Sequence, residues 1–234
     1  MNNNINITFK LDGVQYATPN NIKKVKIVKY LKYLSKVFKF CPKVLNDVCI
    51  LDEGETIEGN FNKLSQQDKK TCYDYYIKVV SFWTGAPEQK LKSLDLKKLE
   101  LAFWGIEFLF GGFTPNPDFV GFEVDGIEYL LPKEHMAQST LIEFAECAEY
   151  EEKVKEYNSG NHYAMLDLMA ILCRPKGEEY DEHKNPERKR IFGALSLDVG
   201  LNVCFFLNRL NITLGQILLI YSLMAQQTTD TLSK

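Results

Sequence analysis

Phe9-Lys-Leu-Asp-Gly-Val-Gln-Tyr-Ala-Thr-Pro19 returns later in the chain as Phe122-Glu-Val-Asp-Gly-Ile-Glu-Tyr-Leu-Leu-Pro132. Phe, Asp, Gly, Tyr and Pro are identical at matching positions, and two further positions carry similar apolar residues. An Asp-Gly pair between β-favouring flanks predicts a β-hairpin, because a type I′ turn needs a positive φ at both central residues. The proline then ends each ladder, since it has no N–H to donate. The sequence therefore predicts two hairpins of one kind.

A second, shorter sequence repeat accompanies the first. Ser93-Leu-Asp-Leu96 and Ser196-Leu-Asp-Val199 each precede an apolar helical run. The chain of 234 residues is long enough for two domains of roughly 100 to 120 residues each. We therefore predict two tandem modules, 1–113 and 114–234, produced by duplication. The expected fold class is mainly α (α+β), with a β-hairpin followed by three to four helices in each module.

The first module contains a basic helix, predicted over Ile22–Phe40 and ended by Pro42. The segment 22–43 holds eight lysines and no acidic residue. Five of these lysines recur at steps of three, four and seven residues and form one stripe: Lys29, Lys32, Lys36, Lys39 and Lys43. Like charges at this spacing destabilise a helix by a few tenths of a kcal/mol per pair, and an anionic partner relieves them.

The second module carries an acidic helix, predicted over Gln138–Tyr157. Its polar face holds several glutamates, among them Glu143, Glu146 and Glu149. The lysine stripe could be a solvated face, could contact a nucleic-acid backbone, or could contact this acidic helix in a neighbouring copy. Basic and acidic helices at equivalent positions favour a head-to-tail contact, which closes into a ring where the rotation permits.

The other helices are predicted from apolar periodicity, glycine and proline breaks and capping residues. They cover 73–83, 96–110, 163–172, 196–207 and 212–225. Ser93 is the expected N-cap of the 96–110 helix. Asp47–Gln67 is expected to be a loop, and Lys176–Arg190 a loop that enters a short helix near Pro186. The aromatic residues of the 73–83 helix are either core or a stacking platform for bases.

Reactive motifs are missing from the sequence. The six cysteines include no CxxC pair, the three histidines are isolated, and the acidic cluster Asp52–Glu55 does not have the spacing of an EF-hand loop. We expect no catalytic residue, no metal site, no cofactor and no small-molecule substrate. The net charge is −3, which gives no global bias towards nucleic acid. We also expect no membrane-spanning segment and no secretion signal, hence folding in a reducing cytoplasm.

Two passages resemble small helical tail-assembly proteins of tailed bacteriophages. The first is Tyr75-Tyr-Ile-Lys-Val-Val-Ser-Phe-Trp-Thr-Gly85 with Leu91-Lys-Ser-Leu-Asp-Leu-Lys-Lys-Leu99. The second is Leu168-Met-Ala-Ile-Leu-Cys-Arg-Pro175 with Glu178-Glu-Tyr-Asp181 and the stretch 192–199. The resemblance covers about half of each module.

This resemblance implies a structural or assembly role without catalysis. The expected protein is a homo-oligomeric virion component assembled in the bacterial host cytoplasm, such as a subunit of the tail or of a portal–tail connector ring. It would contact other phage structural proteins and, through the lysine stripe, packaged DNA or another subunit. A tail assembly chaperone is the first alternative. An accessory protein that binds nucleic acid through the lysine helix is the alternative from another class.

Overall fold

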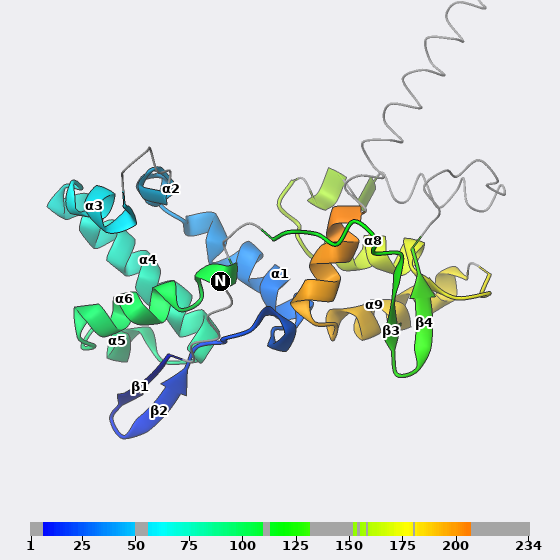
Figure 1. Ribbon diagram of the computed structural model, residues 1–234, viewed down its shortest axis with the longest axis horizontal. Helices are drawn as coiled ribbons and strands as arrows, with labels where there is room; N and C mark the ends of the chain where they lie inside the picture. The colour runs from blue at the N-terminus through cyan, green and yellow to red at the C-terminus, as the bar shows by residue number, and fades with distance from the viewer. Residues whose placement is uncertain are drawn as a thin grey trace, which may run out of the picture. The chain divides into compact units, whose positions relative to one another are not determined.

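The computed structural model describes residues 7–49, 56–109, 113–131, 152–153, 155–157, 159–179 and 181–206 (Figure 1). The described chain is mainly helical and contains two small antiparallel sheets. It divides into two compact units, Met1–Gly112 and Phe113–Lys234, termed unit 1 and unit 2.

Each unit contains one of the predicted hairpins. Their strands are β1 (Thr8–Leu11), β2 (Val14–Ala17), β3 (Gly121–Val124) and β4 (Ile127–Leu130). Asp12 and Gly13 have φ of 48° and 79°, and Asp125 and Gly126 have φ of 50° and 80°. These are the positive values that the turn requires, so both hairpin predictions are confirmed.

The two hairpins also share their register. Phe9 lies opposite Tyr16, and Phe122 lies opposite Tyr129. The paired rings stack in both, with centroids 5.7 Å apart in the first hairpin and 5.4 Å in the second. A cross-strand aromatic pair therefore supports each short ladder.

Unit 1 is otherwise helical. Its elements are η1 (Ile22–Lys24), α1 (Ile27–Lys36), η2 (Phe38–Phe40), α2 (Lys43–Cys49), α3 (Ile57–Asn62), α4 (Gln66–Thr84), α5 (Glu88–Leu91), α6 (Leu96–Trp104) and η3 (Glu107–Leu109). Its longest helix, α4, begins where the Ser65 side chain accepts a hydrogen bond from the Asp68 N–H, and it ends at Gly85 with φ 78°. Both ends follow ordinary capping chemistry.

The predicted basic helix over 22–40 is wrong in its limits. Val25 and Lys26 adopt extended backbone conformations, and the Val25 side chain is buried, so the 3-10 turn η1 is separate from α1. A β-branched residue with a buried side chain favours the extended conformation at this position. Beyond Lys36 the chain passes through Val37 into the second 3-10 turn, η2.

The loop predicted over Asp47–Gln67 is also wrong, because α2, α3 and the start of α4 cover most of its described part. Unit 1 thus has more helices than the predicted three to four. Thr56 caps α3 by accepting a hydrogen bond from the Gly59 N–H. Asp95, not Ser93, caps α6, and the Ser93 hydroxyl donates to the Lys90 carbonyl instead. Apolar periodicity did not indicate these two N-caps, because helices α3 and α6 are short.

Unit 2 continues from its hairpin with α8 (Ala164–Leu172), β5 (Arg174–Pro175), η4 (Glu182–Lys184) and α9 (Asn185–Gly193), and residues 197–206 are helical. The helix predicted over 163–172 is confirmed to within one residue. Strand β5 was not predicted, and it pairs with β4 to make a three-stranded sheet. Phe192 of α9 packs edge-on against Phe122 and Tyr129, at 5.4 and 5.2 Å between ring centroids.

A buried arginine ties α9 to the rest of unit 2. The Arg188 guanidinium donates to the Ala170 carbonyl of α8 at 3.3 Å and to the Glu178 carboxylate at 2.7 Å. The Lys184 ammonium donates to the same carboxylate at 2.9 Å. Burial raises the pKa of Glu178, but the hydrogen bonds and charges of Lys184 and Arg188 outweigh it, so the net pKa lies below its usual value.

We predict that Glu178→Gln lowers the free energy of unfolding of unit 2 by about 1 to 3 kcal/mol at pH 7, because Arg188 then loses its ionic partner. A lowered folded-state pKa stabilises the fold above the unfolded value near 4.5, and this stabilisation is lost as pH falls through the folded value. Denaturant unfolding at several pH values should therefore show the difference between wild type and variant shrinking below about pH 4.5. The neighbouring exposed Glu179→Gln is the matched control; a difference that stays constant with pH contradicts the prediction.

Candidate functional site

The predicted lysine stripe lies on α1, η2 and the first residue of α2. Lys32 and Lys36 are exposed one turn apart on α1, Lys39 is exposed in η2, and Lys43 is exposed at the start of α2. All five predicted lysines are exposed, and these four are cations that a partner could reach.

Lys29, the fifth, has a structural partner. Its ammonium donates to the Trp83 carbonyl at 3.2 Å and lies 5.2 Å from the centroid of the Trp83 ring. Burial, followed by the nearby charge of Lys32, lowers its pKa. Trp83 is in the last turn of α4, where unpaired carbonyls attract cations. Lys29 therefore holds α1 against α4, which the sequence did not predict.

Two phenylalanines interrupt the lysine stripe. Both lie within the range that was predicted as one helix, but 44% of Phe38 and 57% of Phe40 are exposed. The ammonium groups of Lys39 and Lys78 lie 5.0 and 5.3 Å from the centroid of the Phe40 ring. Phe38, Lys39 and Phe40 are therefore an exposed group of aromatic and cationic side chains, here termed the Phe38–Phe40 turn.

The aromatic residues of the predicted 73–83 helix lie in α4. Tyr75, Tyr76 and Trp83 are buried, as the core alternative requires, while Tyr73 and Phe82 are half-buried. The Tyr75 hydroxyl lies 2.9 Å from the hydroxyl of Tyr33, a fully buried residue of α1. Most of this aromatic set thus joins α1 and α4 and is not a stacking platform.

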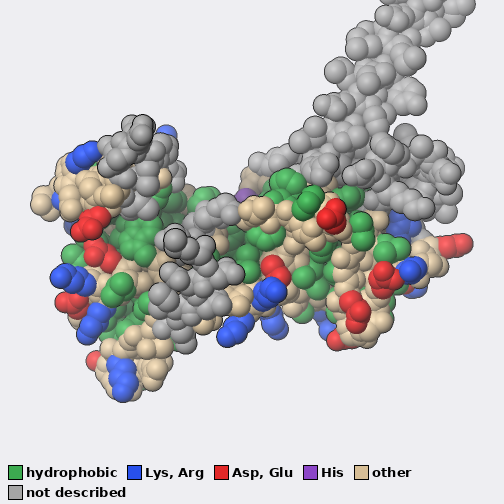
Figure 2. All heavy atoms as spheres, viewed as in Figure 1, with side chains coloured by type: hydrophobic (Ala, Val, Ile, Leu, Met, Phe, Trp, Pro, Cys, Tyr) green, Lys and Arg blue, Asp and Glu red, His purple; other side chains and the backbone are tan. Residues whose placement is uncertain are grey.

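An open cleft of about 620 Å³ lies between α3, α4 and α6. Its aromatic walls are Phe61, Tyr73, Tyr76 and Trp104, and its charged residues are Glu58, Glu100 and Lys97. Figure 2 shows hydrophobic side chains gathered here, bordered by acidic and basic ones. Leu101, of which 59% is exposed, lines the same cleft. These residues are termed the aromatic cleft.

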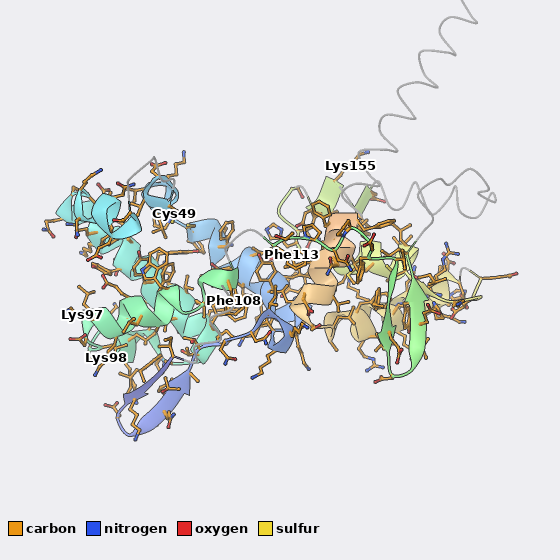
Figure 3. All side chains as sticks on the ribbon, in the orientation of Figure 1. Cys49, Lys97, Lys98, Phe108, Phe113 and Lys155 are labelled. Atoms are coloured by element: carbon orange, nitrogen blue, oxygen red, sulfur yellow. The ribbon has the colours of Figure 1, made fainter. Side chains whose placement is uncertain are left out.

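The cleft is negatively charged overall, with two carboxylates and one ammonium. The Tyr73 hydroxyl donates to a Glu100 carboxylate oxygen at 2.8 Å, which fixes that carboxylate on the wall. Burial and this hydrogen bond raise the pKa of Tyr73 to about 12. Lys97 projects from the side of α6 next to Lys98 (Figure 3). The cleft can therefore receive an apolar group accompanied by positive charge.

The thiols of the core are held in the protonated form. Burial raises the pKa of Cys72 to about 11 and that of Cys204 to about 12, and it also raises the pKa of Cys173. Because the thiolate is the nucleophile, these shifts disfavour reaction at the three sulfur atoms. Among the described residues, no group of three or more His, Cys, Asp or Glu side chains could hold a metal ion.

Several predicted residues lie outside the described part of the chain. They are Glu143, Glu146 and Glu149 of the acidic helix, the acidic cluster Asp52–Glu55, and His135. His183 is exposed, as expected for an isolated histidine in a charged segment. The head-to-tail pairing of basic and acidic helices therefore stays a prediction.

Comparison with protein-family models, with curated proteins and with solved structures gave no match. Within the described residues, no helix is both long enough and apolar enough to cross a membrane.

The aromatic cleft was missed because its walls are far apart in sequence. Phe61 of α3 and Trp104 of α6 meet only through their packing on Tyr73 and Tyr76 of α4. For the Phe38–Phe40 turn a signal did exist, because Phe38-Lys-Phe40 places aromatic residues on both sides of a lysine, next to Pro42. Such a pattern near a helix end is compatible with exposure.

We predict that Lys29→Ala destabilises unit 1 by about 1 kcal/mol, because it removes a half-buried hydrogen bond and a cation–π contact. Lys32→Ala, one turn away on the exposed face, is the control and should change stability by less than about 0.5 kcal/mol. Urea unfolding followed by tryptophan fluorescence measures both. Equal effects of the two substitutions would contradict the structural role given to Lys29.

Proposed function

We propose that the chain is a non-enzymatic bacteriophage morphogenesis protein that acts through protein–protein contacts. In this proposal it is a homo-oligomeric virion component, a subunit of the tail or of the portal–tail connector ring. The observation that carries the proposal is that unit 1 exposes large apolar side chains, Phe40 and Leu101, beside clustered charges. Exposed apolar surface rimmed by charged residues is typical of interaction sites. The likeness of 75–85 and 91–99 to tail-assembly proteins suggests the phage source.

We also infer that the two units descend from one duplicated module. The shared turn conformation and the shared Phe–Tyr register of the hairpins support this inference. In addition, the segment that follows α4 in unit 1 contacts the hairpin of unit 1, and the segment that follows α8 in unit 2 contacts the hairpin of unit 2. Lys90 pairs with Asp12 at 2.8 Å in unit 1, and Lys176 pairs with Glu128 at 3.1 Å in unit 2. A hairpin closed by the following helix and its exit segment is the module that we propose was copied.

Under this proposal the exposed lysines Lys32, Lys36 and Lys39 contact either packaged DNA or acidic residues of another subunit. We predict that Lys32→Glu, Lys36→Glu and Lys39→Glu together abolish assembly into homo-oligomers or particles, because charge repulsion replaces attraction. The circular dichroism of the monomer should stay unchanged, since these side chains are exposed. Mass measurement in solution shows whether homo-oligomers form, and mass spectrometry of purified particles shows whether the variant is incorporated.

The matched control reverses three other exposed lysines, Lys24, Lys92 and Lys155, with the same change of net charge. Wild-type assembly by the first triple variant would remove the role proposed for the lysine surface. A tail assembly chaperone remains the alternative within the same class, and it predicts that the protein is missing from purified virions.

A nucleic-acid-binding accessory protein is the candidate from another class, and one observation favours it. The exposed ring of Phe40 with two lysine ammonium groups resembles the stacking and charge chemistry of single-strand binding sites. This candidate predicts that affinity for random DNA falls steeply between about 50 and 200 mM salt, as phosphate contacts require. Fluorescence anisotropy of a labelled oligonucleotide measures this, and a flat salt response excludes the candidate.

A further inference from the structure

The Phe38–Phe40 turn is an exposed group: the Phe38 ring contacts Tyr33 at 6.2 Å between centroids, and the Phe40 side chain is largely exposed to solvent. More than half of Phe40 is exposed to solvent, although burial of a phenylalanine side chain is favourable. Its two neighbouring cations, Lys39 and Lys78, are within 10.3 Å of each other, because that is the sum of their distances from the ring centroid. Asp74, one turn before Lys78 on α4, is the acidic neighbour on the same helix. The turn therefore presents an apolar tip with a net positive border.

The aromatic cleft has the complementary properties. Its volume of about 620 Å³ lies in the range of roughly 300 to 1,000 Å³ that is usual for clefts that bury organic groups. Phe61, Tyr73 and Trp104 are half-buried and offer ring surfaces to an incoming phenyl group, which favours edge-on or offset packing, whereas Tyr76 is buried. Glu58 and Glu100 outweigh the single ammonium of Lys97. The cleft therefore fits an aromatic side chain accompanied by lysines.

The turn and the cleft lie on opposite sides of α4. Phe40 contacts α4 at Lys78, whereas the cleft contacts it at Tyr73 and Tyr76. At about 100° of rotation per residue, Lys78 is turned roughly 200° from Tyr76 and roughly 140° from Tyr73. The turn consequently faces away from the cleft of its own chain. A second copy can use both surfaces at once.

We propose that the Phe38–Phe40 turn of one copy inserts into the aromatic cleft of a second copy. Phe40 packs among the cleft rings, and Lys39 and Lys78 pair with Glu58 and Glu100. The proposal rests on the proposed function, because it names the partner surface for self-assembly. Since the two surfaces differ and face opposite ways, the contact is head-to-tail, and its repetition gives a closed ring or an open filament.

Complementation between two variants tests this contact. Phe40→Ala removes the tip, and Leu101→Lys places in the cleft a positive charge that repels Lys39 and Lys78; both residues are largely exposed, so both variants should fold, as circular dichroism can verify. Each variant alone should weaken self-association by at least about tenfold, through loss of the aromatic anchor in one and charge repulsion in the other. An equimolar mixture should form dimers and nothing larger, because Phe40→Ala keeps an intact cleft and Leu101→Lys keeps an intact turn. Light scattering coupled to size separation measures the masses.

Several results would overturn the proposal. They are a wild-type chain that stays monomeric at high concentration, variants that assemble like wild type, or a mixture that stays monomeric. Wild-type assembly that appears only after nucleic acid is added also overturns it. A different outcome rejects this contact but leaves the proposed function standing. In that outcome assembly is lost when the charges of Glu143, Glu146 and Glu149 are reversed, while the Phe40→Ala variant still assembles. Absence of the protein from purified particles, with the mixture still forming dimers, rejects the virion role instead.

Discussion

The arrangement of unit 1 depends on one buried pair, the hydroxyl groups of Tyr33 on α1 and Tyr75 on α4, 2.9 Å apart. One hydroxyl donates to the other, and an unpaired hydroxyl in the same place would cost about 1 to 3 kcal/mol. The Tyr33 ring also contacts Phe82 and Trp83, at 5.7 and 5.4 Å between centroids. This pairing fixes the rotation of α1 about its axis. As a result Lys29 reaches the end of α4, whereas Lys32 and Lys36 face solvent.

Features that depend on neighbouring residues could be predicted from the sequence, whereas contacts between segments far apart in the sequence could not. The turns at Asp12-Gly13 and Asp125-Gly126 need only their own dihedral angles, so both hairpins could be predicted from the sequence. The inward contact of Lys29 depends on Trp83, more than fifty residues away, and no helical spacing reveals it. The aromatic cleft depends in the same way on packing between three helices. Periodicity identifies a helix face but does not say which neighbour covers it.

The ionisable groups named below differ in their charge state according to whether they are buried or exposed. In the interior, the phenols of Tyr33 and Tyr75 and the thiols of Cys72 and Cys173 have raised pKa values because burial disfavours their charged forms. These groups stay neutral and serve packing and hydrogen bonding. Charged side chains also border the Phe38–Phe40 turn and the aromatic cleft, where a partner could reach them. Recognition of a partner surface uses charge in this way, at a rim around an apolar centre.

The strength of such a contact can be bounded. Burial of one phenylalanine ring contributes about 1.5 to 3 kcal/mol, and each exposed ion pair adds between about 0 and 1 kcal/mol. Association itself costs an estimated 4 to 15 kcal/mol in lost freedom, so the turn and the cleft alone give a weak contact. In a closed ring, however, the last copy makes two contacts while it loses its freedom only once. Weak complementary surfaces on opposite sides of α4 therefore favour completed rings over free pairs.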